Sequence, residues 1–188
     1  MAKLMVNNPP STEDAPMMAK LAKIGLVPGQ DFDLGKLEPA VADAISSAPK
    51  VAWKKIVDYT KDSGQTKDGW LLNLKVGHYG TDYMARAWLS AFGIPANAPK
   101  DAVYVVGMAD SGGQPLDASK NNYVIHFDKA SNLPPASGFW SLTMYDSGYF
   151  FIPNPLNRYT VSMRNKLKTN PDGSIDLYLQ KDNPGPDK

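Results

Sequence analysis

The chain has 188 residues, no cysteine, and 20 basic against 19 acidic side chains, which leave a formal charge of +1. This length is enough for a core that folds without metals or cross-links. The absence of cysteine excludes disulfides and thiolate chemistry. The balanced charge, without a dense run of Lys or Arg, argues against a nucleic-acid partner, and no apolar run is long enough for a membrane span.

The first part of the sequence, residues 1–98, predicts a helical segment with one short strand or loop. Ser11 or Thr12 is suited to cap a first helix, which Gly25 ends. Residues 64–80 mix a strand pattern around their tryptophan with irregular structure.

Two longer helical patterns follow within this part. The region from 37 to about 58 is expected to form two pieces, because Pro49 lies inside it. A further helix is predicted over 83–92. Its side chains are apolar nearly all round, which predicts burial on most of its faces.

Beyond residue 98 the hydrophobic period changes to two, and turn sequences rich in Gly separate the segments. Because no helix separates these strands, they favour an antiparallel β sandwich, similar to a jelly roll, over a parallel sheet. We therefore expect an α+β fold, with the helices packed on a sandwich over 99–181 as one compact domain and a frayed tail over 182–188. The predicted strands are 102–109, 122–128, 138–146, 158–163 and 174–180.

A polar face of this sandwich is the first candidate binding site. Arg158 and Tyr159 open a strand directly after a turn, where binding groups can converge on a rigid support. Strand alternation would give a hollow rich in hydroxyl groups around one cation. A purely structural role for Arg158 stays an equal alternative. The expected members are Arg158, Thr160, Ser162, Ser141, Thr143 and Tyr145.

Arg86 is a second candidate, since it lies in the middle of an apolar helix. An unpaired guanidinium would be costly to bury there. A structural ion pair with a carboxylate such as Asp82 or Asp146 is the favoured interpretation. The alternative is an anchor for an anionic substrate group, which the planar guanidinium suits.

The two histidines complete the candidates. His126 alternates with Val124 on a predicted strand and is suited to act as acid, base or ligand, although a structural role is favoured. His78 together with His126 and Asp128 or Asp110 would make a metal site, but the sequence offers no ligand-like spacing. The favoured interpretation contains no metal and no cofactor.

Several segments are similar, in order, to a bacterial family of unknown function. They include Ala22-Lys-Ile-Gly-Leu-Val-Pro-Gly29, Gly77-His-Tyr-Gly-Thr-Asp-Tyr-Met-Ala-Arg-Ala87, Phe139-Trp-Ser-Leu-Thr-Met-Tyr145, Asn157-Arg-Tyr159 and Asp172-Gly-Ser174. The chain resembles the carboxy-terminal half of proteins that join domains of unknown function 1254 and 1214. The resemblance implies helices on a jelly-roll-like sheet, an upstream β domain that this sequence lacks, and a periplasmic location for full-length forms. The sequence as given, whether a fragment or a natural short form, favours the cytoplasm.

The favoured function is binding, with or without transformation, of a small polar or anionic molecule on the sandwich. Whether the protein is an enzyme stays open. One alternative is a non-catalytic structural or cell-envelope module whose sheet face meets another domain or a second copy, and another is a metal-dependent jelly-roll enzyme. The expected ligand-binding residues are Arg158, Tyr159, Tyr145, Tyr123, His126 and Arg86.

Overall fold

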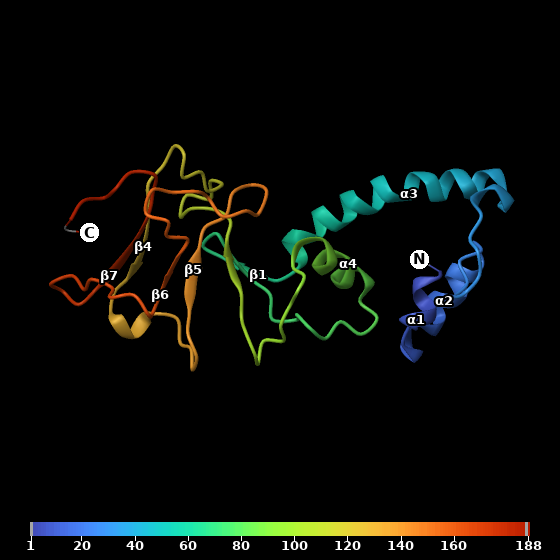
Figure 1. Ribbon diagram of the computed structural model, residues 1–188, viewed down its shortest axis with the longest axis horizontal. Helices are drawn as coiled ribbons and strands as arrows, with labels where there is room; N and C mark the ends of the chain where they lie inside the picture. The colour runs from blue at the N-terminus through green and yellow to red at the C-terminus, as the bar shows by residue number, and fades with distance from the viewer. Residues whose placement is uncertain (1, 187) are drawn as a thin grey trace. The chain divides into compact units, whose positions relative to one another are not determined.

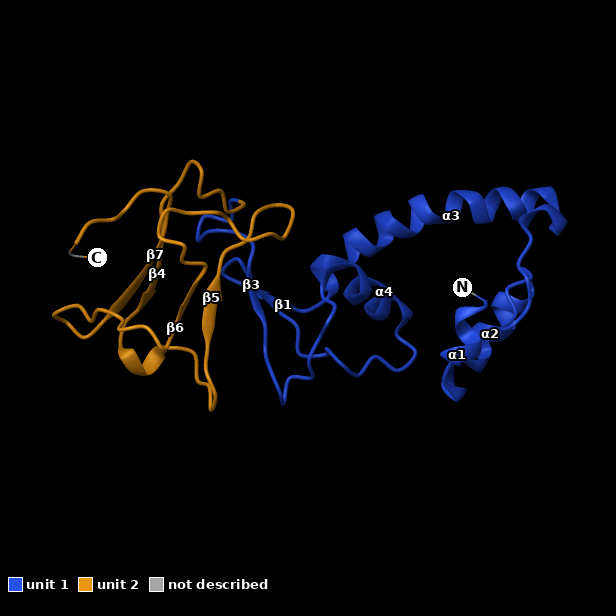
Figure 2. Cartoon of the chain, viewed as in Figure 1, with its two compact units in different colours: residues 1–114 blue, residues 115–188 orange. Residues whose placement is uncertain are grey.

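A computed structural model describes residues 2–186 and 188 of the chain. These residues form two compact units, 1–114 and 115–188, which Figure 2 shows in blue and orange. Helices lie in the first unit, and strands lie in both (Figure 1). The expected α+β class is confirmed.

The first helices of unit 1 are short, and a capping residue lies between the first and the second of them. Helix α1 (Leu4–Asn7) is followed by the 3₁₀ turn η1 (Thr12–Asp14) and by α2 (Ala15–Ala22). The backbone N–H and the hydroxyl of Ser11 each donate to Asp14 Oδ2 at 3.2 Å. Ser11 is therefore the cap of the expected first helix.

Helix α3 (Pro39–Asp58) is continuous, between the 3₁₀ turns η2 (Leu34–Lys36) and η3 (Tyr59–Asp62). The expected division at Pro49 is wrong, because this proline lies inside the helix. Proline removes one backbone donor from a helix. Residues 46–50 are exposed, so water can bind the carbonyl group that loses its partner.

Helix α4 (Tyr83–Phe92) has the bounds that the sequence predicts. The Asp82 carboxylate accepts from the backbone N–H of Ala85 at 2.9 Å and caps its first turn. The expected burial on most faces is wrong, since no residue of α4 is buried. The helix is half-buried, because α3 and η3 are the elements that pack on it.

Aromatic rings join α4 to α3 and η3. The ring centroids of Trp53 and Phe92 are 5.7 Å apart, those of Trp88 and Phe92 6.0 Å, and those of Tyr59 and Trp88 6.5 Å. The indole N–H of Trp88 donates to Thr60 Oγ1 at 3.0 Å. The polar edge of this ring is therefore satisfied while its apolar body packs in the cluster.

Unit 1 also contains a three-stranded antiparallel sheet in the order β1-β2-β3. The strands are β1 (Gln65–Lys67), β2 (Trp70–Leu72) and β3 (Val105–Gly107), and Leu71 of β2 is buried. Strand β3 was expected in the sandwich with the later strands. It instead pairs with β2, where Leu71 lies opposite Val106.

Unit 2 contains two antiparallel strand pairs and the 3₁₀ turn η4 (Ala130–Asn132). Strands β4 (Tyr123–Phe127) and β7 (Ile175–Leu179) pair along their full length. Strands β5 (Ser141–Thr143) and β6 (Thr160–Ser162) form the second pair. All lie inside the predicted ranges but are shorter, and their packing as a sandwich stays a prediction.

No helix in the described part of the chain is both long enough and apolar enough to cross a membrane.

Candidate functional site

An imidazole–carboxylate pair lies across β4 and β7. The register of the two strands places His126 directly opposite Asp176. The Nδ1 atom of His126 is 2.7 Å from Asp176 Oδ1. On the other side of the ring, Nε2 is 3.4 Å from Asp128 Oδ1. The imidazole therefore has one close and one looser carboxylate partner.

The carboxylate of Asp176 is held in place by its neighbours. Its Oδ2 atom accepts from Asn170 Nδ2 at 2.9 Å, and the Tyr178 hydroxyl is 3.5 Å from the same oxygen. Asn170 also donates to Ser174 Oγ at 2.9 Å, within the turn that precedes β7. The side chain of Asp176 is only 20% exposed. We expect this network to fix the orientation of the carboxylate more firmly than that of the ring it faces.

These contacts shift the acid–base equilibria of the pair. The hydrogen bond to Asp176 raises the pKa of His126, whereas partial burial lowers it. The negative charges of Asp176, Asp128 and Asp172 raise it further. The same hydrogen bond, with that from Asn170, lowers the pKa of Asp176. Compared with free side chains, the contact thus stabilises the protonated form of the imidazole and the ionised form of the carboxylate.

A row of three aromatic rings lies elsewhere in unit 2. The rings of Tyr145 and Phe151 are stacked at 5.4 Å, and an isolated β-bridge joins the two residues. The ring of Phe151 is also 5.5 Å from that of Tyr159. Two predicted site residues, Tyr145 and Tyr159, therefore lie on either side of Phe151, which the sequence analysis did not single out.

Arg158 precedes the last ring of this row. Its backbone N–H donates to Asn154 Oδ1 at 3.1 Å, and its carbonyl accepts from Asn154 Nδ2 at 2.9 Å. The residue is exposed, and its guanidinium is in none of the ion pairs found between described residues. The backbone of Arg158 is thus fixed, while its guanidinium forms no ion pair with a residue that the structure describes.

Arg86 is paired within unit 1. Its Nη1 is 3.0 Å from Asp14 Oδ1, and the guanidinium carbon lies 5.2 Å from the centre of the Tyr83 ring. Burial tends to raise the pKa of Asp14, but hydrogen bonds from Tyr83, Arg86 and Ser11, together with the Arg86 charge, hold it below its ordinary value. Arg86 therefore has an ion-pair partner, which is Asp14 in place of the expected Asp82 or Asp146, and its role in ligand binding stays a prediction.

The hydroxyl of Tyr123, at the start of β4, accepts hydrogen bonds from nearby residues of the same unit. The oxygen accepts from the backbone N–H of Asp117 at 2.7 Å and from Asn121 Nδ2 at 3.3 Å. No ring contact between described residues joins Tyr123 to the aromatic row. Its role in ligand binding stays a prediction.

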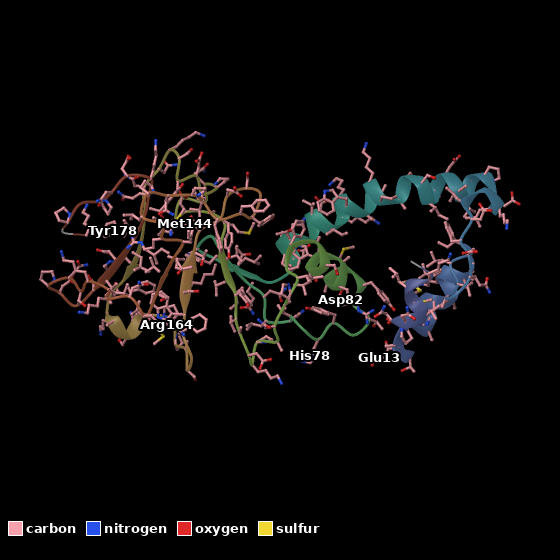
Figure 3. All side chains as sticks on the ribbon, viewed as in Figure 1. Glu13, His78, Asp82, Met144, Arg164 and Tyr178 are labelled. Carbon is pink, nitrogen blue, oxygen red and sulfur yellow. The ribbon has the colours of Figure 1, made fainter. Side chains whose placement is uncertain are left out.

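An open cavity of about 420 Å³ lies in unit 1 beside the start of α4. Figure 3 labels two of its lining residues, His78 and Asp82, and Lys75 and Tyr79 also line it. The sequence analysis considered His78 only as a metal ligand. No signal in the sequence indicated the cavity, because it forms between the 74–82 loop, α4 and Pro99.

The expected metal alternative gains no support from the side chains. No group of three or more His, Asp or Glu residues within 2–186 and 188 has an arrangement that would hold a metal ion. His126 has two carboxylate neighbours, but Asp176 and Asp128 lie at different ring nitrogens. A single metal ion cannot use all three groups in this geometry.

Two comparisons with known proteins found a similarity to this chain. Residues 101–188 match the model of a family described as "Protein of unknown function (DUF1214)". No curated protein matches the chain. The chain is similar to the crystal structure of the VPA0106 protein from Vibrio parahaemolyticus, with a TM-score of 0.56 and 24% identity. The match covers 93% of this chain and 41% of that protein, and at this identity it shows a shared fold alone.

Proposed function

Residues 101–188 of this chain belong to the DUF1214 family of unknown function, and from the chemistry of unit 2 we propose that the protein binds a small polar or anionic molecule. The binding surface comprises the rings of Tyr145, Phe151 and Tyr159 and the guanidinium of Arg158; it is called the aromatic face below. The observation that carries the proposal is the row of ring contacts that ends at Tyr159; the next residue toward the N-terminus, Arg158, has a guanidinium in none of the ion pairs between described residues.

The rings of the aromatic face are ordered by one another yet remain accessible. Their exposed fractions are 54% for Tyr145, 53% for Phe151 and 37% for Tyr159. Rings that pack edge to face or offset lose little further entropy when a flat molecule stacks on them. This surface suits a ligand with one flat apolar side, such as an aromatic ring or a pyranose.

Arg158 adds a preference for negative charge. A guanidinium binds carboxylates through two parallel hydrogen bonds, and its side chain has no competing ion pair among the described residues. The Asn154 side chain holds the backbone on both sides of the Arg158 Cα. Aromatic carboxylates and sugar acids combine both required features.

Ligand-detected NMR with benzoate and with galacturonate tests this proposal. We expect one of these probes to bind the natural protein and to lose at least about tenfold in affinity with Arg158→Gln. Arg164→Gln is the matched control, because Arg164 lies 5.2 Å from the Phe139 ring in a cation–π contact outside the aromatic face. Equal affinities for the natural protein and both variants, or no binding of either probe, would contradict the proposal.

A second candidate function, assembly with another copy of the chain, is favoured by a separate observation. Two turns next to the aromatic face expose large apolar side chains: Tyr149 by 69% and Phe150 by 72% in the first, and Leu156 by 66% in the second. Neighbouring exposed apolar side chains of this size are typical of protein contacts. Light scattering at increasing concentration should show a dimer that Phe150→Ser dissociates, whereas a monomer at all concentrations would reject assembly.

A further inference from the structure

The two carboxylate partners of His126 differ in how firmly they are held. We propose that His126 is a proton-transfer residue that promotes the hydrolysis of small neutral carboxylic esters by water, with Asp176 as its positioning residue. This site is separate from the aromatic face, so its failure or success does not decide the ligand-binding proposal.

The contact with Asp176 determines which ring nitrogen is available. Since the carboxylate accepts at 2.7 Å, the neutral imidazole keeps its proton on Nδ1 and leaves a lone pair on Nε2. The side chain of His126 is 52% exposed, so a small molecule can reach Nε2. An oriented imidazole with one free nitrogen is the arrangement that general base catalysis requires.

Asp128 lies near Nε2, but it is held less firmly than Asp176 is at Nδ1. Its carboxylate is 79% exposed and lies 3.4 Å from Nε2, whereas Asp176 is 20% exposed and lies closer. An exposed ion pair of this kind is worth little and can open. The Asp128 side chain can therefore move aside for a substrate, while Asp176 stays in place.

The surrounding charges select the class of substrate. Three carboxylates act on His126, from Asp128 just after β4, Asp176 in β7 and Asp172 in the turn before β7. The other hydrogen-bond donors to Asp176, Asn170 and Tyr178, are uncharged, and one cation, the Lys188 ammonium, lies 5.3 Å from the centre of the Tyr178 ring. Three carboxylates disfavour phosphates and other anions by repulsion, so a neutral ester is the better substrate.

Water is the nucleophile in the proposed step. The hydroxyl of Ser174 is not available, since it donates to Asp172 Oδ1 at 2.7 Å and the residue is buried. His126 Nε2 takes a proton from water as the water oxygen bonds to the acyl carbon. The bond from that carbon to the leaving oxygen then breaks, and the proton passes from Nε2 to the leaving oxygen, which yields one acid and one alcohol.

Hydrolysis of p-nitrophenyl acetate, followed by p-nitrophenol release, measures this activity. We expect His126→Gln to lower kcat/KM by about tenfold or more. His78→Gln is the matched control, because His78 is the other histidine of the chain and is also exposed, and it should retain the natural rate. Equal losses in both variants, or no loss in His126→Gln, would overturn the proposal.

The pH profile separates proton transfer from a structural role. The rate should rise with pH through the pKa of His126, which is higher than the value of about 6.5 for a free histidine. Asp128→Asn should lower the midpoint of this rise and keep the rate at high pH, whereas Asp176→Asn should lower both. If His126→Gln does not fold, Asp128→Asn decides: an unchanged midpoint contradicts the proposal, and a lowered one supports it.

Discussion

Arg86 on α4 and Asp14 at the start of α2 form an ion pair of 3.0 Å, although 72 positions separate them in the sequence. The Tyr83 hydroxyl donates to the same oxygen of Asp14 at 3.0 Å. One carboxylate thus receives hydrogen bonds from two residues on one side of α4. The contact ties the first helices to the rest of unit 1.

Replacing this carboxylate should loosen unit 1. We expect Asp14→Asn to lower the melting temperature by about 5 °C, because Arg86 and Tyr83 both lose an ionised acceptor. Glu13→Gln changes the neighbouring carboxylate, which is exposed, and should leave the melting temperature unchanged within about 1 °C. Thermal unfolding followed by circular dichroism compares the two variants, and equal shifts would argue against the importance of the ion pair.

The stability of unit 2 should depend on pH through His126. Its pKa is raised by folding, chiefly by the hydrogen bond to Asp176, so its stabilising effect is complete below about pH 6.5 and is lost as the pH rises through the folded-state pKa. Asp176, whose pKa is lowered chiefly by the same hydrogen bond, adds stability above about pH 4 that is lost on acidification.

Urea unfolding between pH 5 and pH 9 tests this linkage. The natural protein and His78→Gln should both lose stability as the pH rises above about 6.5, and His126→Gln should lack this change. A His126→Gln variant with the same pH dependence as the natural protein would show that another group is responsible.

Gly69 should tolerate no side chain. Its φ is +79°, and a Cβ atom there would lie 2.2 Å from the backbone oxygen of Ala109. We expect Gly69→Ala to cost about 3 kcal/mol of unfolding free energy. Gly113→Ala, at a similar φ of +77° with open space around it, should cost about 1 kcal/mol from backbone strain alone. Comparable losses in urea unfolding would indicate that the close approach to Ala109 is relieved by a small shift.

Phe151, the central ring of the aromatic face, should be required for ligand binding and should contribute to stability. Phe151→Ala removes both ring contacts, so we expect a fall of a few degrees in melting temperature and loss of benzoate or galacturonate binding. Phe150→Ala, in which the more exposed neighbouring ring is removed, should retain binding of the same probe. The same binding and melting measurements test both variants, and an effect of Phe150→Ala equal to that of Phe151→Ala would refute the assigned role.

Local sequence signals predicted the elements better than their packing. The bounds of α4 followed from the Asp82 cap and Gly93, which act within a few residues. Pro49 was over-weighted, because an exposed helix can lose one hydrogen bond and continue. The pairing of β3 with β2 could not be read from the sequence, since it depends on contacts between strands more than 30 residues apart.

In the candidate site too, local structure was predicted from the sequence and contacts between distant residues were not. Alternation correctly placed His126 on a strand, but its partner Asp176 lies 50 positions away and was found only through the register of β4 and β7. Phe151 was missed because it lies outside any predicted strand, and its bridge to Tyr145 closes a turn. The partner of Arg86, Asp14, could not be identified from the sequence, because 72 positions separate the two residues.

The positions of the four tryptophans give each unit its own fluorescence signal. Trp53, Trp70 and Trp88 lie in the first unit, two of them in the ring cluster on α4, and Trp140 lies in the second. A variant with Trp140 as its single indole would therefore report the unfolding of the strand pairs alone. The complementary Trp140→Phe variant would report the first unit, both its helices and its three-stranded sheet, so the cooperativity between the two units can be measured directly.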